Sequence, residues 1–177
     1  MFGARWQVRR FVRSAADQPV TVLDIDNTLA DAWPSLVAPG GSESERLAGL
    51  EPLPGMKAIA YDDAVAHDRR IVVMSHRHLW HGRLTRRWLT DHGVDVDPWA
   101  VVLVSAASDK PGLIAILSAG GRDVEVWDDL SHGTESGTTQ RYTDVVAALE
   151  RLGVRYHGLD EIEAVVAEAG GRRTAPR

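Results

Sequence analysis

The sequence predicts an α/β fold, a Rossmann-like three-layer sandwich in which helices cover both faces of a central parallel sheet. The first observation behind this prediction is that short apolar, β-branched runs alternate with segments of helical hydrophobic spacing. Such alternation implies crossovers between parallel strands, with helices packed on the sheet. The second is size: 177 residues, 44% of them hydrophobic, fit a single domain over 1–177, since domains usually hold roughly 100–200 residues.

Five segments are predicted as strands of this sheet. Four of them are short runs rich in valine and isoleucine, which is typical of a parallel strand buried on both faces. A fifth apolar run, near the C-terminus, is expected at the edge. The strands are predicted at residues 20–23, 71–74, 101–104, 124–127 and, for the edge, 154–156.

Helices are predicted wherever apolar residues recur at helical spacing after the first strand. Glycine marks the expected end of two of them, at Gly93 and at Gly120–Gly121. Residues 170–177 are expected to form a frayed tail. The helices are predicted at residues 55–68, 79–92, 111–117, 139–152 and 160–169.

Two segments lie outside the regular alternation. Residues 1–18 are predicted to form an N-terminal arm, a short amphipathic helix or irregular segment that docks on the domain, because apolar residues are interspersed with arginines there. A membrane-surface or nucleic-acid role for this arm is the weaker alternative. Residues 30–54 are rich in proline, glycine, serine and glutamate, which predicts an irregular excursion with about one turn of helix.

Composition restricts the functional classes. The chain has no cysteine, which excludes disulfides and thiolate metal sites and makes a reducing, cytoplasmic setting the expected one. No apolar stretch approaches the roughly 20 residues that span a bilayer, so no membrane partner is expected. The net charge of −5 argues against a bulk electrostatic attraction to nucleic acid.

Polar and charged side chains follow four of the predicted strands, directly or within a few residues. In open parallel sheets, ligands bind outside the carboxyl ends of the strands, so these side chains are expected to meet at one edge. They are Asp24 and Asp26 after the first strand, Ser75 after the second, Lys110 after the third, and Asp128 and Asp129 after the fourth.

This combination favours phosphoryl transfer to water. Clustered carboxylates repel one another, and a divalent cation removes that repulsion. Oxygen ligands without histidine or cysteine suit a hard cation such as Mg²⁺, although Mn²⁺ accepts the same ligands. Lys110 and Ser75 supply a positive charge and a hydroxyl donor for phosphate oxygens. One carboxylate can attack phosphorus to give an aspartyl-phosphate, and another can exchange protons with the leaving oxygen and with water.

The motifs resemble those of the haloacid dehalogenase (HAD) superfamily. The run from Val22 to Leu29, VLDIDNTL, is similar to the family's DxDx[TV] signature. Ser75, Lys110 and the Asp128–Asp129 pair resemble the second, third and fourth motifs, in the family order. Asn27 stands where many relatives have glycine, a departure that affects the loop conformation.

The resemblance implies a role for each of these positions. Asp24 would be the nucleophile and a Mg²⁺ ligand, and Asp26 would be the general acid and base and contribute to the metal site. The remaining roles are divided between phosphate and metal: Thr28, Ser75, His76 and Lys110 would bind the phosphoryl group, while Asp128 and Asp129 would complete the metal site.

Substrate contacts are predicted from three residues near the mouth of this site. Arg77 could pair with a second phosphate or a carboxylate. Trp33 could stack on a sugar or base, with a core position as the equal alternative. His132 lies in a glycine- and serine-containing loop at residues 130–137 that is expected to line the site.

Family members often carry a cap domain over the site. The segments between the first and second motifs (29–70) and between the second and third (76–109) are too short for a large cap, so a capless or nearly capless member is predicted. Capless members tend to act on larger substrates or to close the site by oligomerising. A homo-oligomer is therefore one of the possible assemblies.

The leading functional hypothesis is a Mg²⁺-dependent phosphatase for a small phosphorylated metabolite, such as a sugar phosphate or nucleotide. The second hypothesis keeps the chemistry and changes the substrate to a nucleic-acid end, as in a polynucleotide 3′-phosphatase. Phosphoproteins are a third substrate class. A hypothesis of another class is a non-catalytic module that binds a phosphorylated ligand or a partner; the intact set of acidic residues argues against it.

Overall fold

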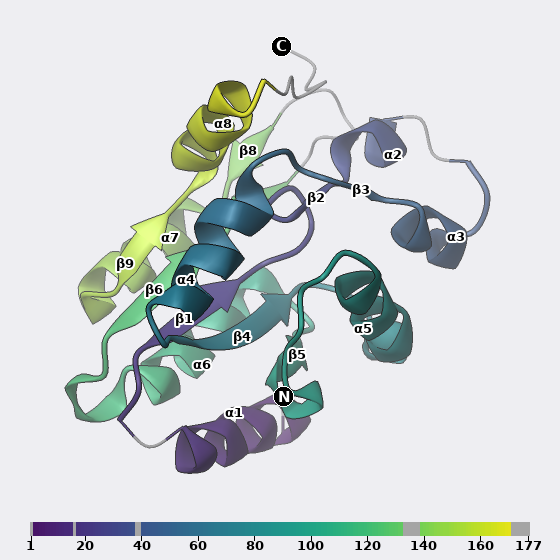
Figure 1. The fold of residues 1–177 in the computed structure, drawn as a ribbon. Coiled ribbons are helices and arrows are strands. Elements are labelled where there is room, and N and C mark those ends of the chain that lie inside the picture. The colour runs from purple at the N-terminus through teal and green to yellow at the C-terminus, as the bar shows by residue number, and fades with distance from the viewer. Residues whose placement is uncertain (1, 16, 38–39, 133–138, 171–177) are drawn as a thin grey trace.

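Five parallel strands form the central sheet of the computed structural model, in the order β5-β4-β1-β6-β9 (Figure 1). The structure describes residues 2–15, 17–37, 40–132 and 139–170. All four neighbouring strand pairs are parallel, and β9 lies at an edge, which confirms both predictions. The strands are β1 (Val20–Leu23), β4 (Arg70–Ser75), β5 (Val101–Leu103), β6 (Val124–Trp127) and β9 (Arg155–His157).

The centre of the sheet is β1, which is buried along its whole length. Val22 lies opposite Val72 of β4 on one side and Val126 of β6 on the other. These β-branched residues fit a pleated surface that is packed on both faces. Because the strands are parallel, the residues that follow β1 and β6 lie side by side at the same edge.

Helices cover both faces of the sheet, as predicted. The alternation of side chains along each strand directs Val22 and Val72 into one apolar cluster and Leu23 and Val73 into the other. The first cluster is covered by α1 (Phe2–Ser14), α6 (Lys110–Leu117) and α7 (Thr143–Leu152). The second is covered by a π-helical turn (Lys57–Asp62) that continues into α4 (Asp63–Ala66), by α5 (Gly82–Asp91) and by α8 (Leu159–Glu168).

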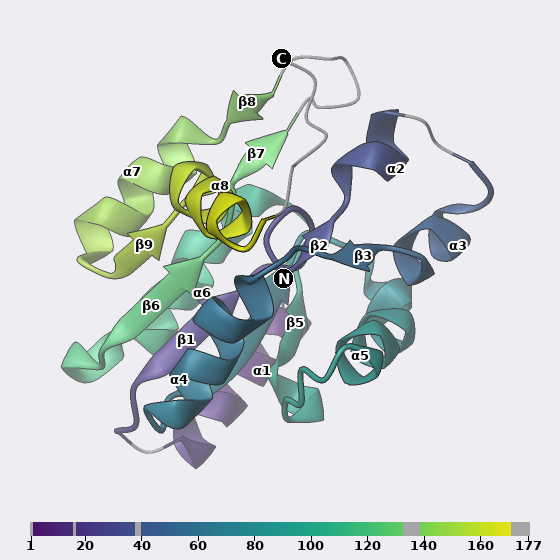
Figure 2. The ribbon, with the colours of Figure 1, turned by 45° about the horizontal axis from the view of Figure 1, so that its top comes forward.

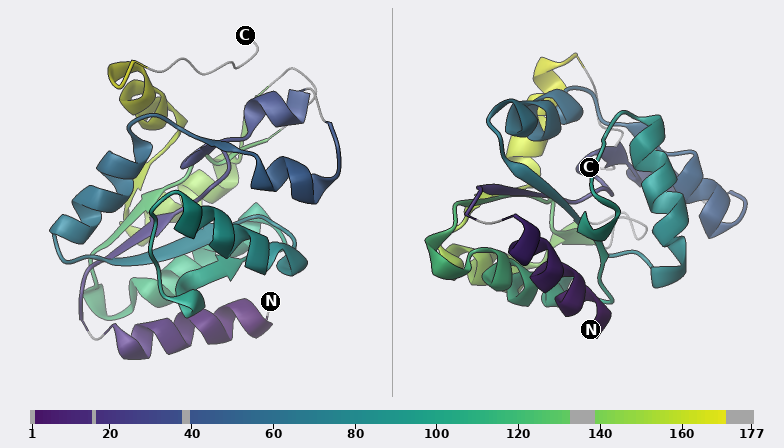
Figure 3. Two further views of the ribbon diagram at one scale, coloured as in Figure 1. Left: turned by 45° about the vertical axis from the view of Figure 1, so that its right-hand side comes forward. Right: turned by 60° about the horizontal axis from the view of Figure 1, so that its bottom comes forward.

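The N-terminal arm is a helix that docks on its own domain. Figure 3 shows α1 running beside α6, and Val8 and Phe11 are buried between the two and the sheet. Trp6 and Arg10 lie on the exposed face, where the Arg10 guanidinium stacks on the Trp6 and Trp99 rings. The predicted amphipathic pattern therefore reflects packing within the chain.

The excursion after β1 is more regular than predicted. It contains β2 (Ala30–Asp31), α2 (Trp33–Val37), α3 (Glu43–Ala48) and β3 (Glu51–Pro52), and β2 pairs antiparallel with β3. A capping box begins α3, because Ser42 Oγ accepts from Glu45 N and Glu45 accepts from Ser42 N. The excursion is held against α5 by the Trp88 indole, which donates to Leu50 O at 2.9 Å.

A second antiparallel strand pair lies at the same end of the molecule as β2, β3 and α2 (Figure 2). It pairs β7 (Ser131–His132) with β8 (Gln140–Arg141). The helix predicted from residue 139 therefore begins only at Thr143. Most of the predicted 130–137 loop and residues 171–177 of the predicted tail lie outside the described residues. Among the helices of the described ranges, none has the length and apolar character needed to cross a bilayer.

Candidate active site

The loop after β1 is a tight turn stabilised by its own backbone. The Ile25 carbonyl oxygen accepts hydrogen bonds from the backbone N–H groups of Thr28, Leu29 and Ala30. Asn27 has a positive φ of 61°, and its side-chain oxygen accepts from Ala32 N at 3.2 Å. Asparagine tolerates this left-handed conformation better than most side chains do, which fits its presence in the turn.

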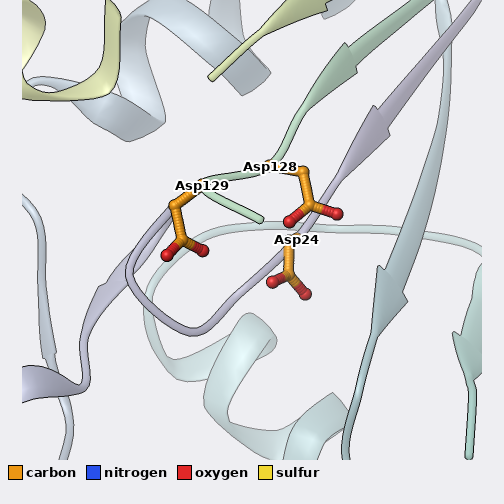
Figure 4. Close-up of side chains that lie close together, drawn as sticks. All are labelled: Asp24, Asp128 and Asp129. Atoms are coloured by element: carbon orange, nitrogen blue, oxygen red, sulfur yellow. The ribbon is translucent and has the colours of Figure 1, made fainter. Parts of the chain in front are cut away.

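Three carboxylates converge beyond the ends of β1 and β6 (Figure 4). One oxygen from each of Asp24, Asp128 and Asp129 lies within 4.8 Å of the others, and all three side chains are buried. Leu23 and Trp127 are paired in register, and Asp24 N donates to Trp127 O at 2.9 Å. The sheet register itself therefore places Asp24 beside Asp128.

Lys110 lies between two of these carboxylates. Its Nζ atom is 2.5 Å from Asp128 Oδ2 and 3.4 Å from Asp24 Oδ2, and the side chain is buried. Burial alone would lower the pKa of Lys110, but the Asp128 and Asp24 carboxylates hold that pKa above its ordinary value. The amine is therefore a fixed positive charge at the base of the site.

The group retains an excess of negative charge. Three carboxylates and one ammonium carry a formal net charge of −2 when ionised. Burial raises the pKa of Asp24 to about 8; Lys110 opposes this rise, and the neighbouring carboxylates add to it. Asp24 Oδ1 and Ser75 Oγ are buried without a hydrogen-bond partner among the described residues. An all-oxygen donor set with excess negative charge and an unsatisfied oxygen fits a hard divalent cation.

The raised pKa of Asp24 predicts an unusual pH dependence of the free energy of unfolding. Its carboxyl pKa is near 3.8 ordinarily and about 8 in the folded protein, so folding favours the protonated form. The stability gained from that proton is fully present below the ordinary pKa and is lost as pH rises through about 8. In EDTA at pH 8, Asp24→Asn is therefore expected to raise Tm by about 5 °C or more, since 1 kcal/mol shifts Tm by roughly 2–4 °C at this size.

Differential scanning fluorimetry between pH 4 and pH 8 checks this expectation. The difference between variant and wild type should shrink toward pH 4, and Mg²⁺ should raise the wild-type Tm more than that of the variant. A difference that does not change with pH would contradict the assignment of a buried, protonated Asp24.

Asp26 lies next to this group and is bound by Arg77. Arg77 Nε donates to Asp26 Oδ2 at 2.7 Å and Nη2 donates to Oδ1 at 2.6 Å. The Arg77 side chain is only 2% exposed, and it also contacts Thr85 Oγ1 at 3.4 Å. Arg77 borders the cavity, but its guanidinium is committed to Asp26; this geometry favours a role in orienting Asp26 over the predicted contact with substrate.

A cavity of about 640 Å³ opens over these side chains. Of the other predicted residues, Ser75, His76 and His132 line it. His76 Nε2 lies 2.9 Å from Ser105 O, and the His132 ring packs on Tyr142 with centroids 4.4 Å apart. Asp26 and Arg77 also border the cavity.

The structure places Thr28 and Trp33 away from the cavity. Thr28 is fully buried, its hydroxyl accepts a hydrogen bond from Asp129 N at 3.1 Å, and it does not line the cavity. Trp33 is 1% exposed and does not border the cavity. Its position in the core, the alternative considered from the sequence, is the observed one.

Several cavity residues were missed by the sequence analysis. Helices α2 and α3 contribute Leu36, Glu43 and Arg46 to one wall, and the turn after β4 contributes Leu79 and Trp80. The sequence signal for α3 was the Ser42–Glu45 capping box. No sequence signal separates an exposed Trp80 from the buried Trp88 eight residues later, because both fit a helical segment.

Comparison with known proteins supports the fold. No protein-family model matches the sequence, and no curated protein matches it significantly. Among solved structures, the chain is similar to a class C acid phosphatase from Bacillus anthracis, determined with tungstate bound. The two share 16% identity with a TM-score of 0.50, over 94% of this chain and 86% of that chain. This likeness concerns the fold, and it confirms the predicted α/β, Rossmann-like architecture with a central parallel sheet.

Proposed function

We propose that the protein is a Mg²⁺-dependent phosphomonoester hydrolase that acts through an aspartyl-phosphate on Asp24. The observation that carries the proposal is the buried group of Asp24, Asp128, Asp129 and Lys110 at the carboxyl edge of the sheet. The acid phosphatase with a similar fold adds support. A bound divalent cation would neutralise charge on the phosphoryl oxygens and on the carboxylates that hold it.

The first half-reaction uses Asp24 and Asp26. A cation bound by these carboxylates would favour the ionised form of Asp24, beside Lys110, and a carboxylate oxygen of Asp24 would then attack phosphorus. As the new oxygen–phosphorus bond forms, the bond from phosphorus to the leaving oxygen breaks, and that oxygen takes a proton from Asp26. Lys110 and the Ser75 hydroxyl stabilise the phosphoryl oxygens.

The second half-reaction regenerates the enzyme. Asp26 accepts a proton from water as the water oxygen attacks phosphorus, and the bond between phosphorus and Asp24 breaks to release phosphate. Arg77 occupies one lone-pair site on each Asp26 oxygen, and a carboxylate has about four such sites. Asp26 therefore retains acceptor capacity toward the cavity while Arg77 fixes its orientation.

The substrate class we propose is a small phosphate ester, either a sugar phosphate or a nucleotide. A cavity of about 640 Å³ falls within the range of roughly 300–1,000 Å³ that holds small ligands. The oxygen donors suit Mg²⁺, with Mn²⁺ as the metal that the same ligands accept. A nucleic-acid end is the less favoured alternative substrate, a homo-oligomer is an open possibility, and a cytoplasmic location is an expectation from the sequence.

Phosphate release from a panel of esters tests the proposal. The panel holds sugar phosphates, mononucleotides, phosphopeptides and 3′-phosphorylated oligonucleotides, each with Mg²⁺, Mn²⁺ or EDTA. We expect metal-dependent release from at least one small ester, with kcat/KM reduced by about 10³-fold or more in EDTA. Release from no ester in any metal, by protein shown to be folded, would favour the phospho-ligand-binding module.

A further inference from the structure

The outer part of the cavity presents apolar surface to solvent. Leu79 and Trp80 line the cavity, yet 70% and 72% of their surfaces are exposed. They belong to the short 3₁₀ turn Leu79–His81, which follows β4 and Ser75. Exposed apolar side chains gathered around a charged pocket are typical of a ligand-binding rim.

The Trp80 ring is held in position by two histidines. The His78 ring stacks on it, with centroids 4.2 Å apart and planes 11° apart. His81, which is buried, meets it edge-on at 5.8 Å and 71°. His78 covers one face of the indole, and the high exposure of Trp80 leaves the other face open. A ring that is already fixed loses little conformational entropy when a planar ligand stacks on it.

Polar side chains of α3 lie beside this turn. Glu43 and Arg46 of α3 line the same cavity, and Glu43 Oε2 lies 3.9 Å from His81 Nε2. The rim therefore pairs an open aromatic face with polar side chains that can meet the edge of a planar ring. Such a combination of stacking surface and polar groups suits a heterocyclic base.

We propose that Trp80 is the stacking surface for the base of a nucleotide whose phosphate lies at Asp24. This inference rests on the proposed function, because it assumes that Asp24 marks the phosphate position. Asp24 is buried at the base of the cavity, whereas Trp80 lies at its exposed rim. In a nucleotide a ribose separates the heterocyclic ring from the phosphate, so the ring could lie at the exposed rim while the phosphate lies beside the buried Asp24. The ligand unit is therefore one nucleotide, either free or at the end of a chain.

The first test compares two esters that differ only in the base. The ratio of kcat/KM for adenosine 5′-phosphate to that for ribose 5-phosphate is measured in wild type, Trp80→Ala and Trp80→Phe. We expect Trp80→Ala to reduce the ratio about tenfold, which corresponds to about 1.4 kcal/mol, chiefly through KM for the nucleotide. Trp80→Phe should retain most of the ratio, because a phenyl ring still stacks.

The matched control is Trp99→Ala, which removes another exposed tryptophan that does not line the cavity. It should leave the ratio unchanged. A ratio that is equally high in Trp80→Ala, or a wild-type ratio near one, would overturn the stacking role while leaving the hydrolase proposal intact.

A binding experiment separates this inference from the proposed chemistry. Asp24→Asn protein is titrated with adenosine 3′-phosphate, adenosine 5′-phosphate and a 3′-phosphorylated oligonucleotide, and binding is followed by calorimetry. Adding Trp80→Ala should weaken nucleotide binding about tenfold. Tryptophan-dependent binding without hydrolysis by wild type would keep the base site and reject the hydrolase; no nucleotide binding would overturn the base site. Preference for the oligonucleotide over the mononucleotides would identify a chain end as the source.

Discussion

Replacing Asp24 with asparagine is expected to lower kcat for phosphate release by about 10⁴-fold or more, the scale of loss when a catalytic nucleophile is removed. Asparagine nearly preserves the shape of the side chain but cannot form an aspartyl-phosphate at a useful rate. The change also removes one charge from the buried group that faces Lys110 and Asp128. Initial rates on the best ester of the panel, at saturating Mg²⁺, provide the measurement.

A matched control separates this effect from general damage. Asp91→Asn alters an exposed carboxylate of α5, which lies 3.4 Å from Arg87, and should keep wild-type kcat. The Asp24→Asn protein should unfold cooperatively with a Tm no lower than that of wild type in EDTA. If the folded variant retains kcat within tenfold of wild type, Asp24 is not the nucleophile.

Replacing Lys110 with methionine is expected to lower the free energy of unfolding by about 3–5 kcal/mol at pH 7 in EDTA, the usual cost of removing one partner from a buried ion pair. Methionine fills similar volume, so the loss is electrostatic: Asp128 and Asp24 would lose the ammonium that lies 2.5 Å and 3.4 Å from them. At this chain length the loss corresponds to a Tm decrease of roughly 6–20 °C. Chemical denaturation at several pH values measures it.

The control for this variant is Lys57→Met. Lys57 also forms an ion pair, with Nζ 2.6 Å from Asp62 Oδ1, but both side chains are substantially exposed. Exposed pairs contribute about 0–1 kcal/mol, so this control should scarcely change stability. Mg²⁺ should restore part of the stability lost in Lys110→Met, since the cation opposes the same repulsion. Equal effects of the two substitutions would contradict the buried charge group described here.

The acidic group at the bottom of the cavity was predictable, because the ends of the parallel strands fix the positions of its residues. Once residues 20–23 and 124–127 are recognised as neighbouring parallel strands, Asp24 and Asp128 must lie together at the carboxyl edge. The ion pair between Arg77 and Asp26 was less accessible from sequence. It requires a buried guanidinium to cross between two loops, which strand and helix periodicity do not encode.

The walls and rim of the site were harder to predict, for reasons of packing. Trp33 and Trp80 are the same residue type, yet Trp33 of α2 is buried and Trp80 is exposed, and residue type does not encode this difference. The hairpin of β7 and β8 has two-residue strands, which are too short to show an alternating pattern. Thr28 is buried and accepts a hydrogen bond from Asp129 N, a contact between residues distant in sequence.

The most direct test of the account is to trap the covalent intermediate. Wild-type protein is mixed with its best ester and Mg²⁺, quenched in acid within the first turnover, digested and mapped by mass spectrometry. We predict a phosphoryl group on Asp24 that forms at least as fast as phosphate is released and is absent in Asp24→Asn. Steady release of phosphate with no label on Asp24, or with a label on another residue, would contradict the mechanism.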